Sequence, residues 1–439
     1  MRQKGSPMRR RAFMSAISVN ALAMAMSPYA FAMGQKQDGS DYGTAKISPT
    51  VVDKIGSRTI RELLDTHQQE LDTQYLPVWE YRGIDWEYGG FMPYWDKDGN
   101  YTTTNKEMYY LGRGIWVFSY LYNHFGKNPK HLEAAEKCIE FINKYGRDEH
   151  GYWNSEFTRE GKVTLGSFNI YGDMYVALGL GEYFKATGDT KVRDIAIETA
   201  HGVNERIVSL DYQHLQGHGG GHEPGTKRLG TWQHFLNALT PLARYTGDAG
   251  VSLIARMCVR NILERHVDPV TGLAFEHLDD QFRPFKYDDR MNHRAVSGWH
   301  SIQAAWMCME EALRIGHRKV FMDALELGRL TLEHCWVDGE RGGLESIRNP
   351  EARVVMSSTT NAPSGATDDA IIFCLLAIEH THAPWAIKWF DRVFTHGQSR
   401  SGLWKRTCLL HHPRRLFYAI DILDRMVARK GRVSDFLET

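Results

Sequence analysis

The stretch Thr187-Gly188-Asp189 lies between two helical windows, and the same Thr-Gly-Asp turn recurs at Thr246-Gly247-Asp248. Gly126-Lys127-Asn128 holds the corresponding place one interval earlier, and the segment from His317 to Lys319 holds it one interval later. Each of these short turns joins a pair of windows with helical periodicity. The interval is about 60 residues with one helix hairpin in each unit, and such a period is typical of a repeat architecture.

Helical periodicity extends over almost the whole chain. Apolar residues recur at three- and four-residue spacing in about twelve windows. These windows are 52–75, 106–125, 130–146, 167–187, 190–208, 229–246, 249–266, 297–316, 319–335, 363–380, 383–397 and 412–430. Twelve helices in six hairpins predict an all-α ring, in which the N-terminal ends of six inner helices and the connecting loops form a bowl. An open helical solenoid is the alternative, but a ring leaves no ends that need capping repeats.

Three short strand-like pieces separate the hairpins. They are Gly90-Phe91-Met92, Gly151-Tyr152-Trp153 and Leu273-Ala274-Phe275-Glu276. We expect these pieces to line the rim of the bowl, because they are too short to build a sheet of their own.

The N-terminal segment has the pattern of an export signal. Arg9-Arg10-Arg11-Ala12-Phe13-Met14 is a twin-arginine motif, a weakly apolar stretch follows from Ala16 to Met26, and Ala30-Phe31-Ala32 offers a cleavage site. We predict a signal peptide over 1–32, a polar linker over 33–51, a catalytic domain over 52–432 and a tail over 433–439, in a protein exported to the periplasm. The apolar stretch is too short and too interrupted for a membrane span.

The charge of the chain limits the classes of binding partner, and the cysteine pattern predicts the state of the thiols. Residues 1–32 carry five Lys or Arg and no acidic residue, so their removal changes the formal charge from 0 to −5. No basic run remains, and neither nucleic acid nor an acidic membrane is expected as a partner. The six cysteines form no CxxC pair and lie mostly in apolar helical contexts, which favours buried free thiols. They are Cys138, Cys258, Cys308, Cys335, Cys374 and Cys408.

Four motifs in order resemble the N-acylglucosamine 2-epimerase family. The first is Gly89-Gly90-Phe91, followed by Asp98-Gly99 and by Gly112-Arg113-Gly114-Ile115-Trp116. The others are the window from Thr231 to Thr240, the helix around Trp299-His300, and His411-His412-Pro413-Arg414. The resemblance covers nearly all of residues 50–430. It implies an (α/α)6 barrel that binds a sugar, opens its ring and moves a proton at C2.

The resemblance also implies roles for particular residues. His300 and His411 match the acid/base pair, His234 matches an auxiliary histidine, and Arg113 matches the family's arginine. Histidine suits such a pair because its unperturbed pKa lies near neutral pH. The negative charge that develops on O1 and O2 of an enediolate needs a fixed donor, which Arg113 can supply. Reprotonation at C2 gives an epimer, and reprotonation at C1 gives a ketose.

Further residues are predicted to bind the substrate. Trp116 and Trp306 can stack on a sugar ring, although core packing is an equally good interpretation for Trp306. The family usually has Glu three residues after the first histidine, whereas this chain has Gln303, which can orient an imidazole but adds no charge. Asp369 is a candidate replacement for a family Glu. Arg414, in the final His-x-x-Arg motif, completes the predicted substrate-binding set.

Each candidate also has a structural interpretation. His300 follows Ser297-Gly298 and could cap a helix, and His412 could be the base in place of its neighbour His411. His234 lies on an apolar helix face, where a core histidine is common. Arg113 could pair with Glu107.

No metal and no cofactor are expected. His214, His218 and His222 are spaced by four, which on a helix would suggest zinc. The surrounding glycines instead predict a loop over 213–226 at the rim of the bowl, which could fold over substrate.

Two rival functions remain. A glycoside hydrolase or lyase would need two carboxylates across the scissile bond. Its candidates are Asp173, Asp288, Asp289, Asp368 and Asp369. A non-catalytic carbohydrate-binding protein is favoured by Gln303 and by the 12 tryptophans. The hydrolase or lyase would act on exported polysaccharide, whereas the expected partner of the epimerase is a small sugar or the reducing end of an oligosaccharide. Which sugar, and the oligomeric state, are not encoded in these patterns.

Overall fold

The computed structural model describes residues 51–96, 98–209, 225–286, 294–339, 343–348, 364–399 and 408–437. All of them belong to one unit, which runs from Pro49 to Thr439. The predicted signal peptide (1–32) and nearly all of the predicted linker (33–51) lie outside these ranges, as does most of the His-Gly-rich loop at 213–226.

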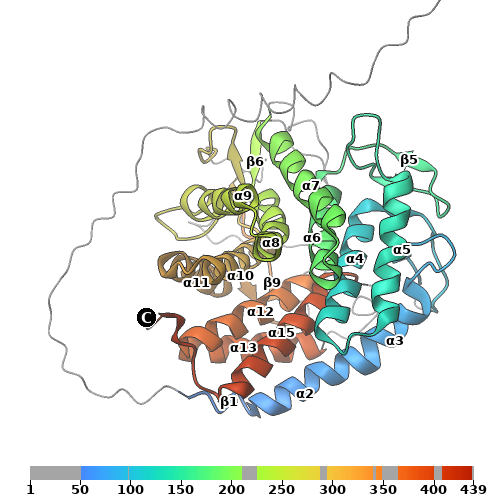
Figure 1. Ribbon diagram of the computed structural model, residues 1–439. Coiled ribbons are helices and arrows are strands. Elements are labelled where there is room, and N and C mark those ends of the chain that lie inside the picture. Colours follow the sequence, from blue (N-terminus) through green and yellow to red (C-terminus); the bar gives the residue numbers. More distant parts are fainter. Residues whose placement is uncertain are drawn as a thin grey trace, which may run out of the picture. The chain divides into compact units, whose positions relative to one another are not determined.

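Twelve helices of eleven or more residues, counted over the described ranges, coincide with the twelve predicted windows. The inner helices are α4 (Met108–His124), α6 (Ile170–Thr187), α8 (Leu229–Thr246), α10 (Gly298–Ile315), α12 (Ser364–Thr381) and α15 (His411–Ala428). The outer helices are α2 (Ile60–Glu70), α5 (Pro129–Tyr145), α7 (Thr190–Val208), α9 (Ala249–Arg260), α11 (Arg318–Cys335) and α13 (Pro384–Ser399). Figure 1 shows the outer set surrounding the inner set. The predicted (α/α)6 barrel is therefore confirmed.

The ring is closed by the two ends of the folded chain. Each inner helix packs against the next one, from α4 to α15, and each of the first five is followed by its own outer helix. The last inner helix, α15, packs instead against α2, the first helix of the ring. Phe417 of α15 stacks on Tyr120 of α4, with ring centroids 5.0 Å apart, and this contact completes the circle. The sixth hairpin therefore joins segments from opposite ends of the folded chain.

The turns that recur in the sequence have one capping geometry. Gly188 and Gly247 end their helices with φ of 71° and 67°, a left-handed conformation that glycine adopts without a steric penalty. The preceding threonine hydroxyls bond to carbonyls four residues back. The following Asp189 and Asp248 cap the next helix by accepting from backbone N–H groups at 2.8 and 2.7 Å. The two Thr-Gly-Asp turns that repeat in the sequence therefore make the same helix-capping hydrogen bonds.

The connections between hairpins lie at the N-terminal ends of the inner helices and form only short ladders. The strands are β1 (Lys54–Ile55), β2 (Arg58–Thr59), β3 (Lys106–Glu107), β4 (Glu156–Phe157), β5 (Val163–Leu165), β6 (Thr226–Arg228), β7 (His277–Asp279), β8 (Trp336–Val337) and β9 (Gly343–Leu344). The predicted strand-like pieces contribute one-residue bridges at Phe91, Trp153 and Ala274. All three side chains are buried, so these pieces anchor the rim segments to the barrel.

Three further features of the barrel bear on the sequence predictions. All six cysteines are buried and free, as predicted. Phe436, in the predicted tail, packs on Phe321 of α11 with ring centroids 5.4 Å apart. Among the helices described, none has both the length and the apolar character that crossing a bilayer requires.

Candidate active site

A cavity of about 230 Å³ opens at the N-terminal ends of the inner helices, and we call it the histidine cavity. Its lining residues come from five inner helices or the residues just before them: Tyr109, Tyr171, Arg228, His234, Trp299, His300, Gln303 and His411. The ring thus brings together the three histidines that the sequence singled out. They share one small space although 177 positions separate the first from the last.

His300 lies in the first turn of α10 and is oriented by a carboxylate. Ser297 caps the helix, since its hydroxyl accepts from the backbone N–H of His300 at 3.2 Å. The capping role is therefore filled by Ser297 and not by the imidazole. Nδ1 of His300 lies 2.8 and 2.9 Å from the two oxygens of Glu276. Because Nδ1–H donates to this carboxylate, the lone pair of Nε2 is left to accept a proton.

Glu276 was not recognised as a site residue from the sequence. It follows directly on the buried rim segment from Leu273 to Phe275, 24 positions before His300. Its Oε1 also accepts from Nε of Arg228 at 2.7 Å. Burial alone would raise the pKa of Glu276, but His300 and Arg228 outweigh it and hold that pKa well below its ordinary value. Glu276 is therefore a carboxylate that faces two donors.

His411 begins α15 on the other wall of the histidine cavity. Its Nδ1 lies 3.3 Å from Oδ2 of Asp369 and 3.2 Å from Nη2 of Arg414. Burial, together with the positive charges of Arg414 and Arg113, lowers the pKa of His411 to about 4, although Asp369 opposes the change. This imidazole is therefore neutral at neutral pH and can accept a proton.

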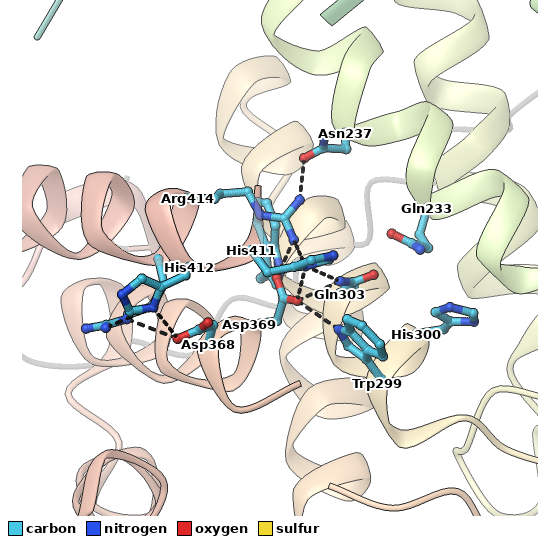
Figure 2. A network of polar contacts seen from close by, with 12 residues as sticks. Gln233, Asn237, Trp299, His300, Gln303, Asp368, Asp369, His411, His412 and Arg414 are labelled. Carbon is cyan, nitrogen blue, oxygen red and sulfur yellow. Dashed lines mark hydrogen bonds and ion pairs between the residues drawn. The ribbon is translucent and has the colours of Figure 1, made fainter. Parts of the chain in front are cut away.

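The carboxylate of Asp369 is fully buried behind His411, where it accepts several hydrogen bonds (Figure 2). Beside His411, four side chains donate to its two oxygens: Gln303 at 2.6 Å, Trp299 at 3.0 Å, Trp306 at 3.1 Å and Arg414 at 2.6 Å. Burial by itself would raise the pKa of this carboxyl group, but Arg414 and the other donors hold it well below the ordinary value. The family usually has Glu at the position of Gln303. The amide of Gln303 supplies no carboxylate, but it holds the carboxylate of Asp369 in place and so compensates for the missing Glu.

His234 lies next to His300, with ring centroids 5.9 Å apart and the rings nearly perpendicular. Nδ1 of His234 lies 2.6 Å from the carbonyl oxygen of Gly230 in its own helix. Burial and the neighbouring His300 lower the pKa of His234 well below its ordinary value. A neutral imidazole whose Nδ1 donates to a carbonyl presents Nε2 as an acceptor.

Arg113 is placed behind the cavity wall and not on it. Its guanidinium lies 3.7 Å from the ring centroid of Tyr109, which lines the cavity. Nη2 donates to the hydroxyls of Tyr109 and, at 2.9 Å, of Tyr175. Arg113 is thus one residue removed from the cavity, with the hydroxyl of Tyr109 between them. The suggested partner Glu107 accepts from Tyr94.

Four of the predicted substrate-binding residues do not face the histidine cavity. Trp116 and Trp306 lie farther along their helices and line a different cavity. Asp369 and Arg414, 0% and 1% exposed, are enclosed behind His411. Gln303 alone of this predicted set lines the histidine cavity. Trp299, beside His300 in the sequence, lines the histidine cavity, and its ring lies 5.0 Å from that of His411 and 6.4 Å from that of His300.

The neighbouring residue His412 points away from the cavity. Figure 2 shows it on the opposite side of α15 from His411, with Asp368. Its ring nitrogens lie 3.5 Å from Asp368 and 3.4 Å from Glu70 of α2. His412 therefore contacts residues of α12 and α2, the neighbours of α15 in the ring. Of these two adjacent histidines, His411 is the one that lines the histidine cavity.

The carboxylates proposed for a hydrolase are engaged elsewhere. Asp173 forms a buried ion pair with Arg206 of α7, between an inner and an outer helix. Asp368 pairs with Arg415 at 3.1 Å. Asp288 and Asp289 lie outside the described residues. Within the ranges that the structure covers, no carboxylate lines the histidine cavity, and no group of three or more potential ligands could hold a metal ion.

The six hairpins thus form an (α/α)6 barrel, and imidazoles from three of its inner helices line one cavity at the N-terminal ends of those helices. The model of the N-acylglucosamine 2-epimerase family matches residues 89–407, and the chain belongs to this family. The resemblance stated from the motifs is therefore confirmed.

Individual relatives agree with this family. The N-acylglucosamine 2-epimerase of Mus musculus is 25% identical over 288 residues, which are 63% of this chain and 66% of the mouse protein. The match thus spans about two thirds of that relative. The cellobiose 2-epimerase of Dictyoglomus turgidum is 25% identical over 66% of this chain and 75% of its own. A crystal structure of D-mannose isomerase has the same fold, with a TM-score of 0.67, 15% identity and coverage of 87% of this chain and 100% of that one. The family and the two epimerase relatives favour a carbohydrate epimerase or isomerase over a glycoside hydrolase, and the structural likeness shows the fold.

Proposed function

We propose that the protein is a sugar epimerase or isomerase that moves a proton at C2 of an open-chain sugar. The observation that carries the proposal is the pair His300 and His411 on one cavity, each with a carboxylate, Glu276 or Asp369, at its Nδ1. A carboxylate at Nδ1 fixes the orientation of an imidazole and so aims its other nitrogen. Family membership supports the same chemistry.

The proton transfer needs one base on each side of the reacting carbon. One imidazole takes the C2 proton next to the carbonyl, and an enediolate forms. The other imidazole must enter the step as the imidazolium, and it gives its ring proton to the opposite face of C2, which yields the epimer and leaves that imidazole neutral. Return of the proton to C1 gives the ketose instead. His411, with a pKa lowered to about 4, is neutral before the reaction, so its ring can take a proton.

The charge on the enediolate oxygens needs a donor that lines the cavity. Tyr109 meets this condition, and burial holds the pKa of its hydroxyl well above the ordinary value, so that the hydroxyl keeps its proton. Its oxygen already accepts from Arg113, which polarises the hydroxyl. We therefore assign the donor role to Tyr109 and a positioning role to Arg113. Arg228 also lines the cavity, and its Nε donates to Glu276 at 2.7 Å.

The size and composition of the cavity limit the substrate. A volume of about 230 Å³ holds one sugar unit, so a longer substrate must enter by its reducing end. The indole Nε1–H of Trp299 donates to Asp369, and this hydrogen bond fixes the orientation of the ring whose face a sugar can pack on. Sugar rings carry apolar C–H faces that pack on such surfaces. The substrate class is therefore a monosaccharide or the reducing end of an oligosaccharide.

Hydrogen exchange at C2 tests the proposal. The full chain is incubated in D2O with N-acetylglucosamine, cellobiose or mannose, and deuterium at C1 and C2 is followed by NMR. We expect label with at least one sugar, and its loss in His300→Asn and His411→Asn. The matched control is His412→Asn, which changes the adjacent side chain on the other face of α15 and should retain exchange if circular dichroism shows it folded.

The other outcomes identify the rival functions. Shortening of an oligosaccharide without label would indicate a hydrolase. Binding without label or cleavage would indicate a carbohydrate-binding protein. Wild-type exchange in both folded cavity variants would refute the two-histidine mechanism.

We also propose that the protein is exported by the twin-arginine route to the periplasm. The motif Arg9-Arg10-Arg11-Ala12-Phe13-Met14 and the small residues at Ala30 and Ala32 support this proposal. Fractionation of cells that express the full chain, compared with Arg10→Lys/Arg11→Lys, tests it. The double variant should remain in the cytoplasm, and equal export of both chains would contradict the proposal.

A further inference from the structure

A second cavity, of about 410 Å³, lies among the C-terminal halves of the inner helices. It is lined from α4, α6, α8, α10 and α15, and it shares no lining residue with the histidine cavity. Trp116 and Trp306, which the sequence assigned to the sugar site, belong to this cavity. The proposed proton transfer uses none of its residues.

A buried polar layer separates the two cavities. Asn237 lines the second cavity, and its Oδ1 accepts from Nη1 of Arg414 at 3.2 Å. Arg414, 1% exposed, donates in turn to Asp369 behind His411. Figure 2 shows this sequence of contacts from Asn237 through Arg414 to His411. The second cavity is thus a separate compartment and not an extension of the histidine cavity.

Opposite charges balance in the wall of the second cavity. Three acidic residues, Glu182, Glu310 and Asp421, face three basic residues, Lys185, Arg244 and Arg425. Lys185 lies 3.3 Å from Glu182, and Arg244 lies 3.2 Å from Glu310. The wall therefore offers strong donors and strong acceptors with no formal net charge from these six residues. Such a wall disfavours an anion or a cation and suits a neutral ligand with many hydroxyl groups.

The lining of the second cavity includes two tryptophan side chains and an amide N–H donor, on Asn237, without a hydrogen-bond partner among the described residues. Trp116 and Trp306, 3% and 1% exposed, line this cavity together with Asn237. Asn237 is 8% exposed, and its Nδ2 has no hydrogen-bond partner among the described residues. Arginine can only donate, so the oxygen of this amide must face Arg414 and the nitrogen must turn away from it. A buried amide donor without a partner is costly, and a ligand oxygen would satisfy it.

We propose that the second cavity binds a monosaccharide unit at a site distinct from the histidine cavity. Paired donors and acceptors match the hydroxyl groups of a sugar, and the indole rings match its C–H faces. The mouth carries Arg244 and Arg425, whose side chains are 44% and 47% exposed, so the site can be reached from solvent. Binding here requires no proton transfer and so does not depend on the proposed catalytic function.

A sugar that cannot open its ring tests the proposal. The probe is 1,5-anhydro-D-glucitol, which lacks the anomeric hydroxyl and therefore cannot be turned over at C2. Its equilibrium binding to the full chain is measured by calorimetry or ligand-observed NMR. Arg244→Met/Glu310→Gln removes both members of one ion pair and leaves no unpaired charge between them. We expect this variant to bind the probe at least about tenfold more weakly, and we expect binding at this site to survive His300→Asn.

The outcomes separate the two cavities. No binding to the wild-type chain would overturn the proposal. Binding that is lost in His300→Asn but kept in Arg244→Met/Glu310→Gln would also overturn it, since the probe would then occupy only the histidine cavity. If the double variant does not fold, Asp421→Asn serves in its place. Its side chain is 27% exposed at the wall, and the same weakening is expected.

Discussion

The carboxylate of Glu276 is the part of the site whose removal gives the sharpest test. Its side chain is 7% exposed, and it accepts from Nδ1 of His300 at 2.8 Å and from Nε of Arg228 at 2.7 Å. Glu276→Gln keeps the size and one acceptor oxygen but replaces the other oxygen with a donor. His300 and Arg228 must then compete for one oxygen, and neither faces a negative charge.

The expected loss follows from the strength of that contact. Removing a carboxylate that orients a functional imidazole typically costs about 10- to 100-fold in activity, or about 1.4 to 2.7 kcal/mol of transition-state stabilisation. We therefore expect the rate constant for C2 exchange in D2O to fall by about this factor. The protein should remain folded, because Glu276→Gln is nearly isosteric.

The control is a carboxylate in an exposed ion pair. Glu264 lies 3.0 Å from Arg260, with a side chain that is 59% exposed, and Glu264→Gln should leave the exchange rate within about twofold. Wild-type exchange in Glu276→Gln over the whole pH range would refute the reasoning, because His300 would then not need its carboxylate.

Three further predictions concern stability. Asp369→Asn leaves the buried Arg414 without its counter-charge and should lower the free energy of unfolding by about 3–5 kcal/mol in urea denaturation; an unchanged midpoint would contradict this. The pKa values of His67 and His411 are lowered from 6.5 to about 3 and about 4, so the unfolded state binds more protons between pH 6.5 and 4. Stability should therefore fall as the pH decreases through this window, by about 2 kcal/mol for each histidine at pH 5, and His67→Gln should reduce that slope. Gly316→Ala, at φ 69°, should destabilise by about 1 kcal/mol, whereas Gly202→Ala within α7 should stabilise by up to about 1 kcal/mol; thermal melts that show equal shifts would contradict the capping account.

The helices were predictable because their signals are local. Each window needs only its own three- and four-residue periodicity, and each turn needs only a glycine with a capping side chain after it. The family resemblance assigned His300, His411 and His234 to one site, and the ring explains why they meet, because its hairpins direct the same ends of their inner helices toward one side. The pairing of α15 with α2 joins the two ends of the ring, and no local pattern encodes it.

The two predicted tryptophans that do not line the histidine cavity share a geometric cause. Trp116 follows Tyr109 by seven positions, which is about 10 Å along a helix axis, and Trp306 follows His300 by six positions, or about 9 Å. A tryptophan in the same helix as a site residue can therefore belong to the opposite end of the barrel. Trp299 and Tyr109 could have been found by asking which aromatic residues lie within one helical turn of His300 and Arg113.

Glu276 could not be found in this way. It belongs to a rim segment between two hairpins, and only the tertiary fold brings it to His300. The sequence around Gln303 suggested a missing carboxylate, and the structure supplies two, from Glu276 and Asp369. Asp369 was already a candidate from the sequence, whereas the identification of Glu276 depended on the packing of the folded chain.

A crystal structure with a bound open-chain alditol would test the central claim most directly. The alditol has the carbon skeleton of the open sugar but cannot react. We predict that a ring nitrogen of His300 and a ring nitrogen of His411 approach C2 from opposite faces, each within about 3–3.5 Å. An alditol that contacts both histidines from the same face of C2, or that binds away from one of them, would contradict the two-base mechanism.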